Sequence, residues 1–108
     1  MSNQEVIEKL WDQKDQINFI KDSEAKKNIE NVLNLLDQGK LRVCEKKDDI
    51  WHVNQWLKKT ILLSFRIQDM EMISGGPSVS DGNTSWWDKV PSKFQNWTSE
   101  NFQSAGFR

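Results

Sequence analysis

The segment at residues 56–67 constrains the fold more than any other part of this chain. It contains neither glycine nor proline, and its second half is crowded with large apolar side chains. Drawn as a helix, it presents apolar side chains in nearly every direction: Ile61, Leu62, Leu63, Phe65 and Ile67. Only a helix that other elements surround can hide such a surface from water. We therefore predict a central core helix here, in which Trp56 and Phe65 are buried.

Two further helices are predicted before this segment. Over residues 4–20 the apolar side chains fall near one helical face, with an interruption around Lys14. They are Ile7, Leu10, Trp11, Ile17 and Ile20. Asp22 or Ser23 can cap a second helix, along which apolar residues recur at helical spacing through residues 25–36. We expect Gly39 to end it, because glycine adopts the left-handed backbone conformation cheaply.

A β-hairpin is predicted between the second helix and the central one. Residues 41–46 and 50–53 are typical of short strands, and the polar residues 47–49 can form the turn. Because so short a hairpin is marginal on its own, we expect it to lie against the helices. Asn54 is expected to cap the central helix. The predicted fold class is mainly α with a small β-hairpin at about 41–53, in a helical core domain spanning residues 1–73.

The last third of the chain has a different composition. Residues 74–85 hold three of the five glycines and one of the two prolines, which predicts a flexible loop. Residues 86–108 are rich in aromatic side chains: Trp86, Trp87, Phe94, Trp97, Phe102 and Phe107. These rings either cap the domain's own core or pack against further protein, and we expect a mixture of the two. Thr98 can cap a short final helix that runs through Ala105 and ends at Gly106.

Composition argues against several classes of function. The formal net charge is −1 and no basic stripe stands out, which argues against nucleic-acid binding. The longest apolar run, residues 60–65, is too short to cross a membrane, and the polar N-terminus lacks an apolar signal region, so we expect a cytoplasmic location.

The single cysteine, Cys44, allows neither an internal disulfide nor a zinc cluster. A catalytic pair with the single histidine, His52, is not expected, since a lone strand cysteine usually behaves as a small hydrophobe.

The residues alone indicate no complete active site. Acidic side chains are dispersed, and no spacing is typical of metal ligands or of a nucleophilic serine. The glycine-rich segment lacks the Gly-x-x-x-x-Gly-Lys-Ser/Thr pattern of a phosphate loop. Lys58, Lys59 and Arg66 form one basic group on the central helix. This group can bind an anion, but a solvated edge or a structural ion pair is the commoner interpretation. We expect no metal and no cofactor bound by this chain.

Four blocks of sequence, in order, resemble the N-terminal domain of the bacterial tetrahydrodipicolinate (2,3,4,5-tetrahydropyridine-2,6-dicarboxylate) N-succinyltransferases. The blocks are LLDxGxLRV at 35–43, QWLKK and LLSFR within 55–66, DKVPxKF at 88–94 and AGFR at 105–108. They are spread over most of the chain. Members of that family are considerably longer, so this chain is expected to be a fragment.

The resemblance implies an acyltransferase of lysine and diaminopimelate biosynthesis that succinylates tetrahydrodipicolinate from succinyl-coenzyme A. In that family, a left-handed parallel β-helix of hexapeptide repeats forms the transfer sites, which lie between the subunits of a homotrimer. The β-helix and the general base are expected after Arg108, so no catalytic residue is assigned here and the fragment alone is expected to be inactive. The N-terminal domain helps to cover the substrate, and its closing Gly-Phe-Arg supplies a substrate-binding arginine, which by position is Arg108.

The alternative interpretation is a non-catalytic helical protein-interaction module whose exposed aromatic side chains bind a protein partner. Independent nucleic-acid binding is less favoured than either, because the net charge is wrong. The coding sequence that follows Arg108 separates the first two: hexapeptide repeats favour the enzyme, and a stop codon favours the module.

Overall fold

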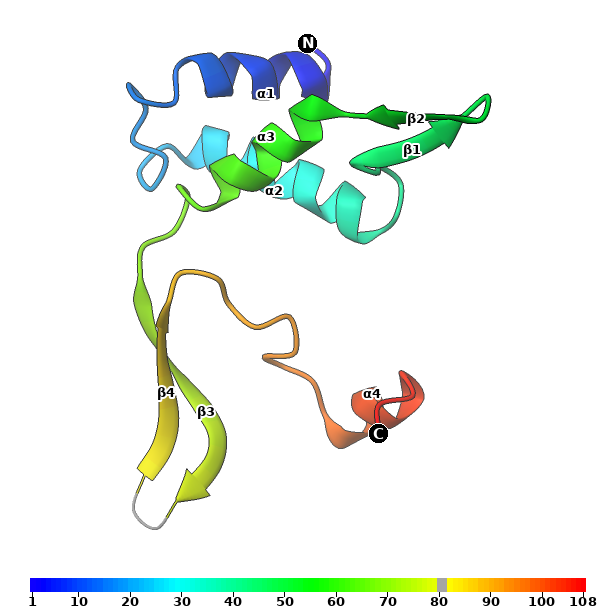
Figure 1. The fold of residues 1–108 in the computed structure, drawn as a ribbon. Helices are drawn as coiled ribbons and strands as arrows, with labels where there is room; N and C mark the ends of the chain where they lie inside the picture. The colour runs from blue at the N-terminus through cyan, green and yellow to red at the C-terminus, as the bar shows by residue number, and fades with distance from the viewer. Residues whose placement is uncertain (80–81) are drawn as a thin grey trace. The chain divides into compact units, whose positions relative to one another are not determined.

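The computed structural model describes residues 1–79 and 82–108, which belong to two units: a helical unit, Met1–Asp69, and a C-terminal unit, Met70–Arg108. The chain is mainly helical with two small antiparallel hairpins (Figure 1), which confirms the predicted fold class, although only the first hairpin was expected. The elements in chain order are α1 (Asn3–Asp12), α2 (Ser23–Asp37), β1 (Cys44–Lys47), β2 (Ile50–Val53), α3 (Gln55–Ser64), β3 (Glu71–Val79), β4 (Gly82–Asp88) and α4 (Ser99–Ser104).

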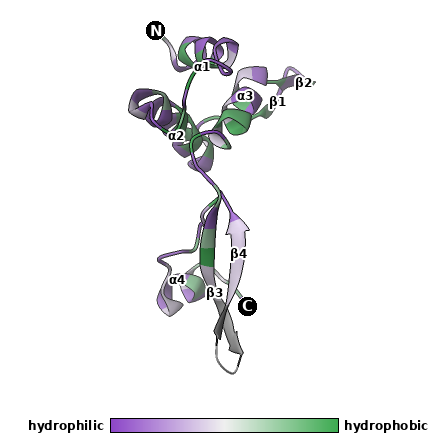
Figure 2. Cartoon of the chain, turned by 90° about the vertical axis from the view of Figure 1, so that its left-hand side faces the viewer, coloured by the Kyte–Doolittle hydropathy of each residue, from purple (hydrophilic) through white to green (hydrophobic). Residues whose placement is uncertain are grey.

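The core of the helical unit lies between α1, α2 and α3, each of which contacts the other two. Hydrophilic and hydrophobic residues alternate along these helices in Figure 2, as expected of helices that bury one face. The buried side chains are Ile7, Phe19, Ala25, Ile29, Val32, Leu57, Thr60, Leu63 and Ile67. Thr60 is the polar member, and its hydroxyl donates a hydrogen bond to the carbonyl oxygen of Trp56 at 2.9 Å. The core is therefore almost wholly apolar.

The central helix α3 is buried on one side only. Leu57, Thr60 and Leu63 face α1 and α2, whereas Ile61 and Leu62 remain 36% and 44% exposed. Phe65, predicted to be buried, is 45% exposed, and Trp56 is only partly buried. The prediction of a surrounded helix is wrong because two helices pack against α3, on the same side, and the hairpin that follows α2 does not cover the other side.

The first helix is shorter than its apolar pattern predicted. It begins with a capping box, in which Ser2 Oγ accepts from the backbone N–H of Glu5 and Glu5 Oε2 accepts from the N–H of Ser2 at 2.6 Å. It ends at Asp12, and a turn follows before α2. Beyond this end Phe19 enters the core, while Ile20, predicted to share the apolar face, is 49% exposed. The polar residues 12–16 offer no apolar anchor that would carry the helix onward.

The second helix matches its prediction at both ends. Asp22 is the N-cap, and its Oδ1 accepts from the backbone N–H of Ala25 at 3.0 Å. At the other end Gly39 has a φ of 71°, and the N–H groups of Gly39 and Lys40 donate to the carbonyl oxygens of Leu36 and Leu35. This pair of hydrogen bonds is the Schellman motif, which satisfies carbonyls that the helix end leaves without partners.

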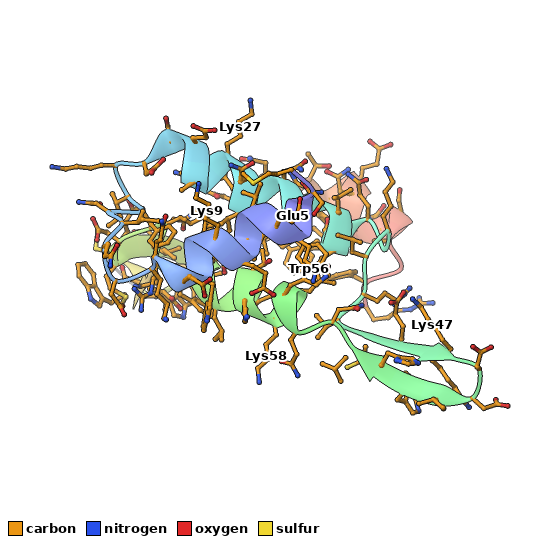
Figure 3. All side chains as sticks on the ribbon, turned by 90° about the horizontal axis from the view of Figure 1, so that it is seen from above. Glu5, Lys9, Lys27, Lys47, Trp56 and Lys58 are labelled. Atoms are coloured by element: carbon orange, nitrogen blue, oxygen red, sulfur yellow. The ribbon has the colours of Figure 1, made fainter. Side chains whose placement is uncertain are left out.

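The first hairpin projects away from the helices in Figures 1 and 3. Asp48 and Asp49, with φ values of 52° and 62°, form the tight turn between β1 and β2. Its large apolar side chains stay exposed, by 61% at Ile50, 67% at Trp51 and 51% at Val53. The expectation that it lies against the helices is therefore wrong. Only the approach to β1 touches the core, through two partly buried side chains, Leu41 and Val43, predicted to be in the strand.

In the C-terminal unit, β3 and β4 occupy much of the 74–85 segment, for which glycine and proline predicted a loop. Residues 80–81 of that predicted loop lie outside the described part of the chain. Pairing is set by the residues beside the glycines, with Met72 opposite Trp87 and Ile73 opposite Trp86. Cross-strand pairs of large apolar side chains stabilise a two-stranded ribbon. The loop prediction considered only the glycine and proline content of the segment and not these pairs beside it.

Candidate functional site

The candidate site lies at the end of the short helix α4, which is defined by its caps. Thr98 Oγ1 accepts from the backbone N–H of Asn101 at 3.3 Å, and Asn101 Oδ1 accepts from the N–H of Thr98 at 2.9 Å. This reciprocal pair confirms Thr98 as the N-cap. Six residues cannot sustain a helix by propensity alone, so these capping bonds largely determine where α4 begins.

Gly106 ends α4, as predicted, with a second Schellman motif. Its φ is 78°, and its N–H donates to the carbonyl oxygen of Gln103 at 3.0 Å. The N–H of Phe107 donates to the carbonyl oxygen of Phe102, also at 3.0 Å. The ring of Phe107 then lies 5.3 Å from the ring of Phe102, which is the apolar contact that commonly accompanies this motif. The helix end is therefore fixed by backbone and side chain together.

Four aromatic rings form a cluster around this turn: Phe94, Trp97, Phe102 and Phe107. Every pair within the cluster is in contact, with ring centroids between 4.9 Å for Phe94–Trp97 and 5.8 Å for Phe94–Phe102. The rings meet edge-on or tilted, the arrangements that the aromatic quadrupole favours. Within the cluster Phe94 and Phe107 are still 40% and 50% exposed, and Trp86 and Trp87, which lie outside it, are 50% and 69% exposed. The six aromatic residues of this segment thus divide into four whose rings contact one another and a pair, Trp86 and Trp87, outside that cluster.

Arg108 follows this turn directly, and its side chain is exposed. Among the residues that the structure describes, no ion pair or hydrogen bond engages its guanidinium. A guanidinium presents a planar fork of N–H donors that matches a carboxylate. The arrangement at this end of α4 is therefore chemically suited to hold a carboxylate, on a backbone that the turn orients.

The basic group on the central helix is used internally. Lys59 forms an ion pair with Glu8 of α1, and its Nζ lies 5.9 Å from the centre of the Trp11 ring. Arg66, just past the end of α3, donates to the carbonyl oxygen of Lys14 at 2.9 Å and pairs with Asp15 at 3.3 Å. Lys58 is exposed and points away from α1 in Figure 3. The interpretation of this group as structural ion pairs is confirmed for Lys59 and Arg66.

Cys44 and His52 cannot act together in this structure. Cys44 is opposite Val53 and His52 is opposite Glu45 in the register of the first hairpin. Since opposite residues share a face and successive residues alternate, the thiol and the imidazole point to opposite faces. Both side chains are exposed. Across the described residues, no group of His, Cys, Asp and Glu side chains could hold a metal ion.

Asn54 performs a role that sequence reasoning missed. It precedes α3, but its side chain makes no capping hydrogen bond. Its amide instead donates to the carbonyl oxygen of Arg42 at 2.6 Å and to Glu45 Oε2 at 2.9 Å, which ties the hairpin to the start of α3. This bond from Asn54, followed by the charge of Lys47, lowers the pKa of Glu45. No local pattern distinguishes such a long-range contact from the capping role that the residue type suggests.

Other surface features carry no candidate residue. Two shallow hollows on the helical unit are lined mainly by polar side chains, one along α1 and the other around residues 16–24. None of the described helices is both long enough and apolar enough to span a membrane.

The sequence matches known proteins along its whole length. Residues 2–67 match the family described as "Tetrahydrodipicolinate N-succinyltransferase N-terminal". A 2,3,4,5-tetrahydropyridine-2,6-dicarboxylate N-succinyltransferase of Brucella suis is 55% identical over 99% of this chain and 37% of its own length. The proteins of that name from Brucella ovis and Brucella canis are 54% identical over the same shares. The chain therefore spans little more than a third of the length of the curated relatives it matches.

Proposed function

Because this chain belongs to the tetrahydrodipicolinate N-succinyltransferase N-terminal family, we propose that it is the substrate-covering part of an acyltransferase that succinylates tetrahydrodipicolinate from succinyl-coenzyme A. The proposal includes the setting that the enzyme class implies: lysine and diaminopimelate biosynthesis in the cytoplasm, and a homotrimer with a hexapeptide-repeat domain. The acyl donor and the general base are assigned to protein beyond this chain, and no catalytic residue is assigned within it.

The observation that carries the proposal is the position of Arg108 at the end of the ordered turn after α4. Tetrahydrodipicolinate is a cyclic imine that bears two carboxylates. A guanidinium can hold a carboxylate through two parallel charge-assisted hydrogen bonds, each of which contributes about 1.5–3 kcal/mol where water is excluded. We assign Arg108 as a substrate-binding residue because this chemistry fits and because its Gly-Phe-Arg segment resembles the one that closes the family's N-terminal domain. The assignment extends to the substrate carboxylate alone, because the general base is assigned to protein beyond this chain.

Steady-state kinetics of the full-length enzyme test this assignment, with each substrate varied in turn. Arg108→Ala should raise KM for tetrahydrodipicolinate while leaving KM for succinyl-coenzyme A nearly unchanged. Arg108→Lys keeps the charge but loses the two-pronged geometry, so it should fall between wild type and Arg108→Ala. Arg42→Ala, which removes an exposed arginine of the helical unit, is the matched control and should change neither KM. Unaltered tetrahydrodipicolinate parameters in Arg108→Ala would refute the substrate-binding role.

The alternative function, a non-catalytic protein-interaction module, is favoured by the exposed Trp51, Trp86 and Trp87. The two proposals differ in what the longer protein does. Full-length protein that releases free thiol from succinyl-coenzyme A only when tetrahydrodipicolinate is present supports the enzyme. The purified 108-residue chain should show no such release under either proposal. Turnover by this chain alone would contradict the placement of the transfer chemistry in protein beyond it.

A further inference from the structure

The backbone at Gly106 determines the course of the chain immediately before Arg108. The φ of 78° belongs to the left-handed region, which L-residues other than glycine rarely adopt. This conformation turns the chain so that Phe107 returns to α4, where its N–H reaches the carbonyl oxygen of Phe102. Phe107 also meets three rings, at 5.3 Å from Phe102, 5.4 Å from Phe94 and 5.7 Å from Trp97.

These contacts fix the residue to which Arg108 is attached. Phe107 is held by one backbone hydrogen bond and three ring contacts, so the starting point of the Arg108 side chain is held as well. If Gly106 left the left-handed region, both Schellman hydrogen bonds and the ring contacts of Phe107 would be lost together. The Arg108 side chain would then extend from a different position. A displacement of about 1 Å at a group that orients substrate can cost about 100-fold in rate.

Gly106 is required for its backbone conformation and not for space. A Cβ placed on it would meet no other atom within 4 Å. A substitution at this position therefore tests φ without introducing a clash. Alanine resists the left-handed region, whereas asparagine visits it more readily, so the two residues should form a graded pair.

We propose that Gly106 is a positioning residue: its left-handed conformation, closed by the packing of Phe107 on Phe102, sets where the Arg108 guanidinium meets a substrate carboxylate. The proposal rests on the function proposed above, because it takes Arg108 as the residue that binds the dicarboxylate. Gly106 itself touches no substrate. Its effect passes through Phe107 to Arg108.

The chain contains a matched control at Gly39. This glycine has a φ of 71° and ends α2 with the same two hydrogen bonds, but it lies in the helical unit. A Cβ placed on Gly39 would lie 3.8 Å from Nη2 of Arg42, which is an ordinary contact. Gly39→Ala and Gly106→Ala therefore impose the same backbone strain at two different places.

The test is steady-state kinetics on the full-length enzyme, with KM measured separately for tetrahydrodipicolinate and succinyl-coenzyme A. We expect Gly106→Ala to raise KM for tetrahydrodipicolinate by about 5–30-fold, the factor that corresponds to the left-handed strain of a non-glycine residue. KM for succinyl-coenzyme A should change little. Gly106→Asn should show a smaller rise. Gly39→Ala should lower the midpoint of thermal unfolding and leave both KM values unchanged.

A double variant separates positioning from general damage. If Gly106 acts through Arg108, Gly106→Ala should add nothing to the effect of Arg108→Ala, because the two changes remove one interaction. An additive effect, or equal changes in both KM values, would overturn the positioning role. So would a Gly106→Ala enzyme with wild-type kinetics alongside an impaired Arg108→Ala enzyme, and this result would leave the substrate-binding role of Arg108 intact. If Arg108→Ala is itself without effect, both proposals fall. Should Gly106→Ala not fold, Gly106→Asn decides by the same comparison.

Discussion

Every buried side chain that the structure describes lies in the helical unit, whereas the described side chains of the C-terminal unit are all exposed or only partly buried. The helical unit is held by apolar contacts between α1, α2 and α3, which are distant in sequence. The C-terminal unit is stabilised by local interactions: strand pairing between β3 and β4, the caps of α4 and the four-ring cluster. A shared core makes unfolding cooperative, whereas segments stabilised by local interactions can unfold one at a time.

This difference bears on function, because the proposed substrate-binding residue, Arg108, belongs to the unit without a buried core. Ligand-binding segments are commonly drawn from the less stable parts of a protein. The local interactions of the C-terminal unit nevertheless define one backbone conformation at the end of α4. An arginine placed there can be oriented by the turn and still gain further packing from a longer protein.

The largest expected effect comes from a core truncation that has a counterpart in the aromatic cluster. Leu57→Ala removes a fully buried side chain and should lower the free energy of unfolding of the helical unit by about 2–5 kcal/mol. Phe102→Ala removes one ring of the four and should leave that free energy within about 0.5 kcal/mol of wild type. Urea unfolding followed by far-UV circular dichroism measures both. Equal losses would show that the two units unfold as one.

A second truncation locates the edge of the core on α3. Phe65→Ala should cost about 1–2 kcal/mol, less than the roughly 3–5 kcal/mol of a fully buried phenylalanine, because nearly half of this side chain is already exposed. The same unfolding experiment applies. A loss of about 3–5 kcal/mol in the free energy of unfolding would show that Phe65 is covered in solution, as the apolar pattern of 56–67 predicted.

The helix caps offer a matched pair of smaller changes. Asp22→Ala should destabilise the helical unit by about 1 kcal/mol, since α2 forms only as part of the cooperative core. Thr98→Ala removes an equivalent cap from α4 but should alter only the local signals of residues 98–107 in an NMR spectrum. The comparison breaks down if Thr98→Ala shifts the unfolding midpoint of the helical unit as far as Asp22→Ala does.

The smallest expected effect is a pH dependence at Glu45. Asn54 and then Lys47 lower its pKa in the folded chain below 4.5, so the unfolded chain takes up the proton first as pH falls. The associated stability is present above pH 4.5 and is lost as pH decreases through the folded pKa. An NMR titration should show the Glu45 pKa rising toward its usual value in Asn54→Ala. If the Glu45 pKa stays unchanged in Asn54→Ala, charged groups and not the Asn54 hydrogen bond lower it.

Features governed by neighbouring residues could be predicted from the sequence, and features governed by distant ones could not. Asp22, Gly39, Thr98 and Gly106 act within a few residues of themselves, and each has its predicted role. Phe65 depends on which elements lie beside α3, and nothing in its own segment reveals that they cover only one side. The glycine-rich residues 74–79 continue a strand in which Met72 and Ile73 pair with Trp87 and Trp86, residues that are distant from them in sequence. The role of Arg108 remains a proposal, since it depends on a substrate and on protein beyond this chain.

Hydrogen exchange resolved along the 108-residue chain tests the contrast between the two units most directly. Amides in α2 and α3 that surround the buried Ile29 and Leu63 should exchange only through global unfolding of the helical unit, and they should share one free energy of opening. Amides of β3, β4 and α4 should exchange through separate openings of lower free energy, and Leu57→Ala should leave these unchanged. If both units show the same highest protection, and Leu57→Ala lowers it equally in both, then one cooperative core stabilises the whole chain and the distinction is wrong.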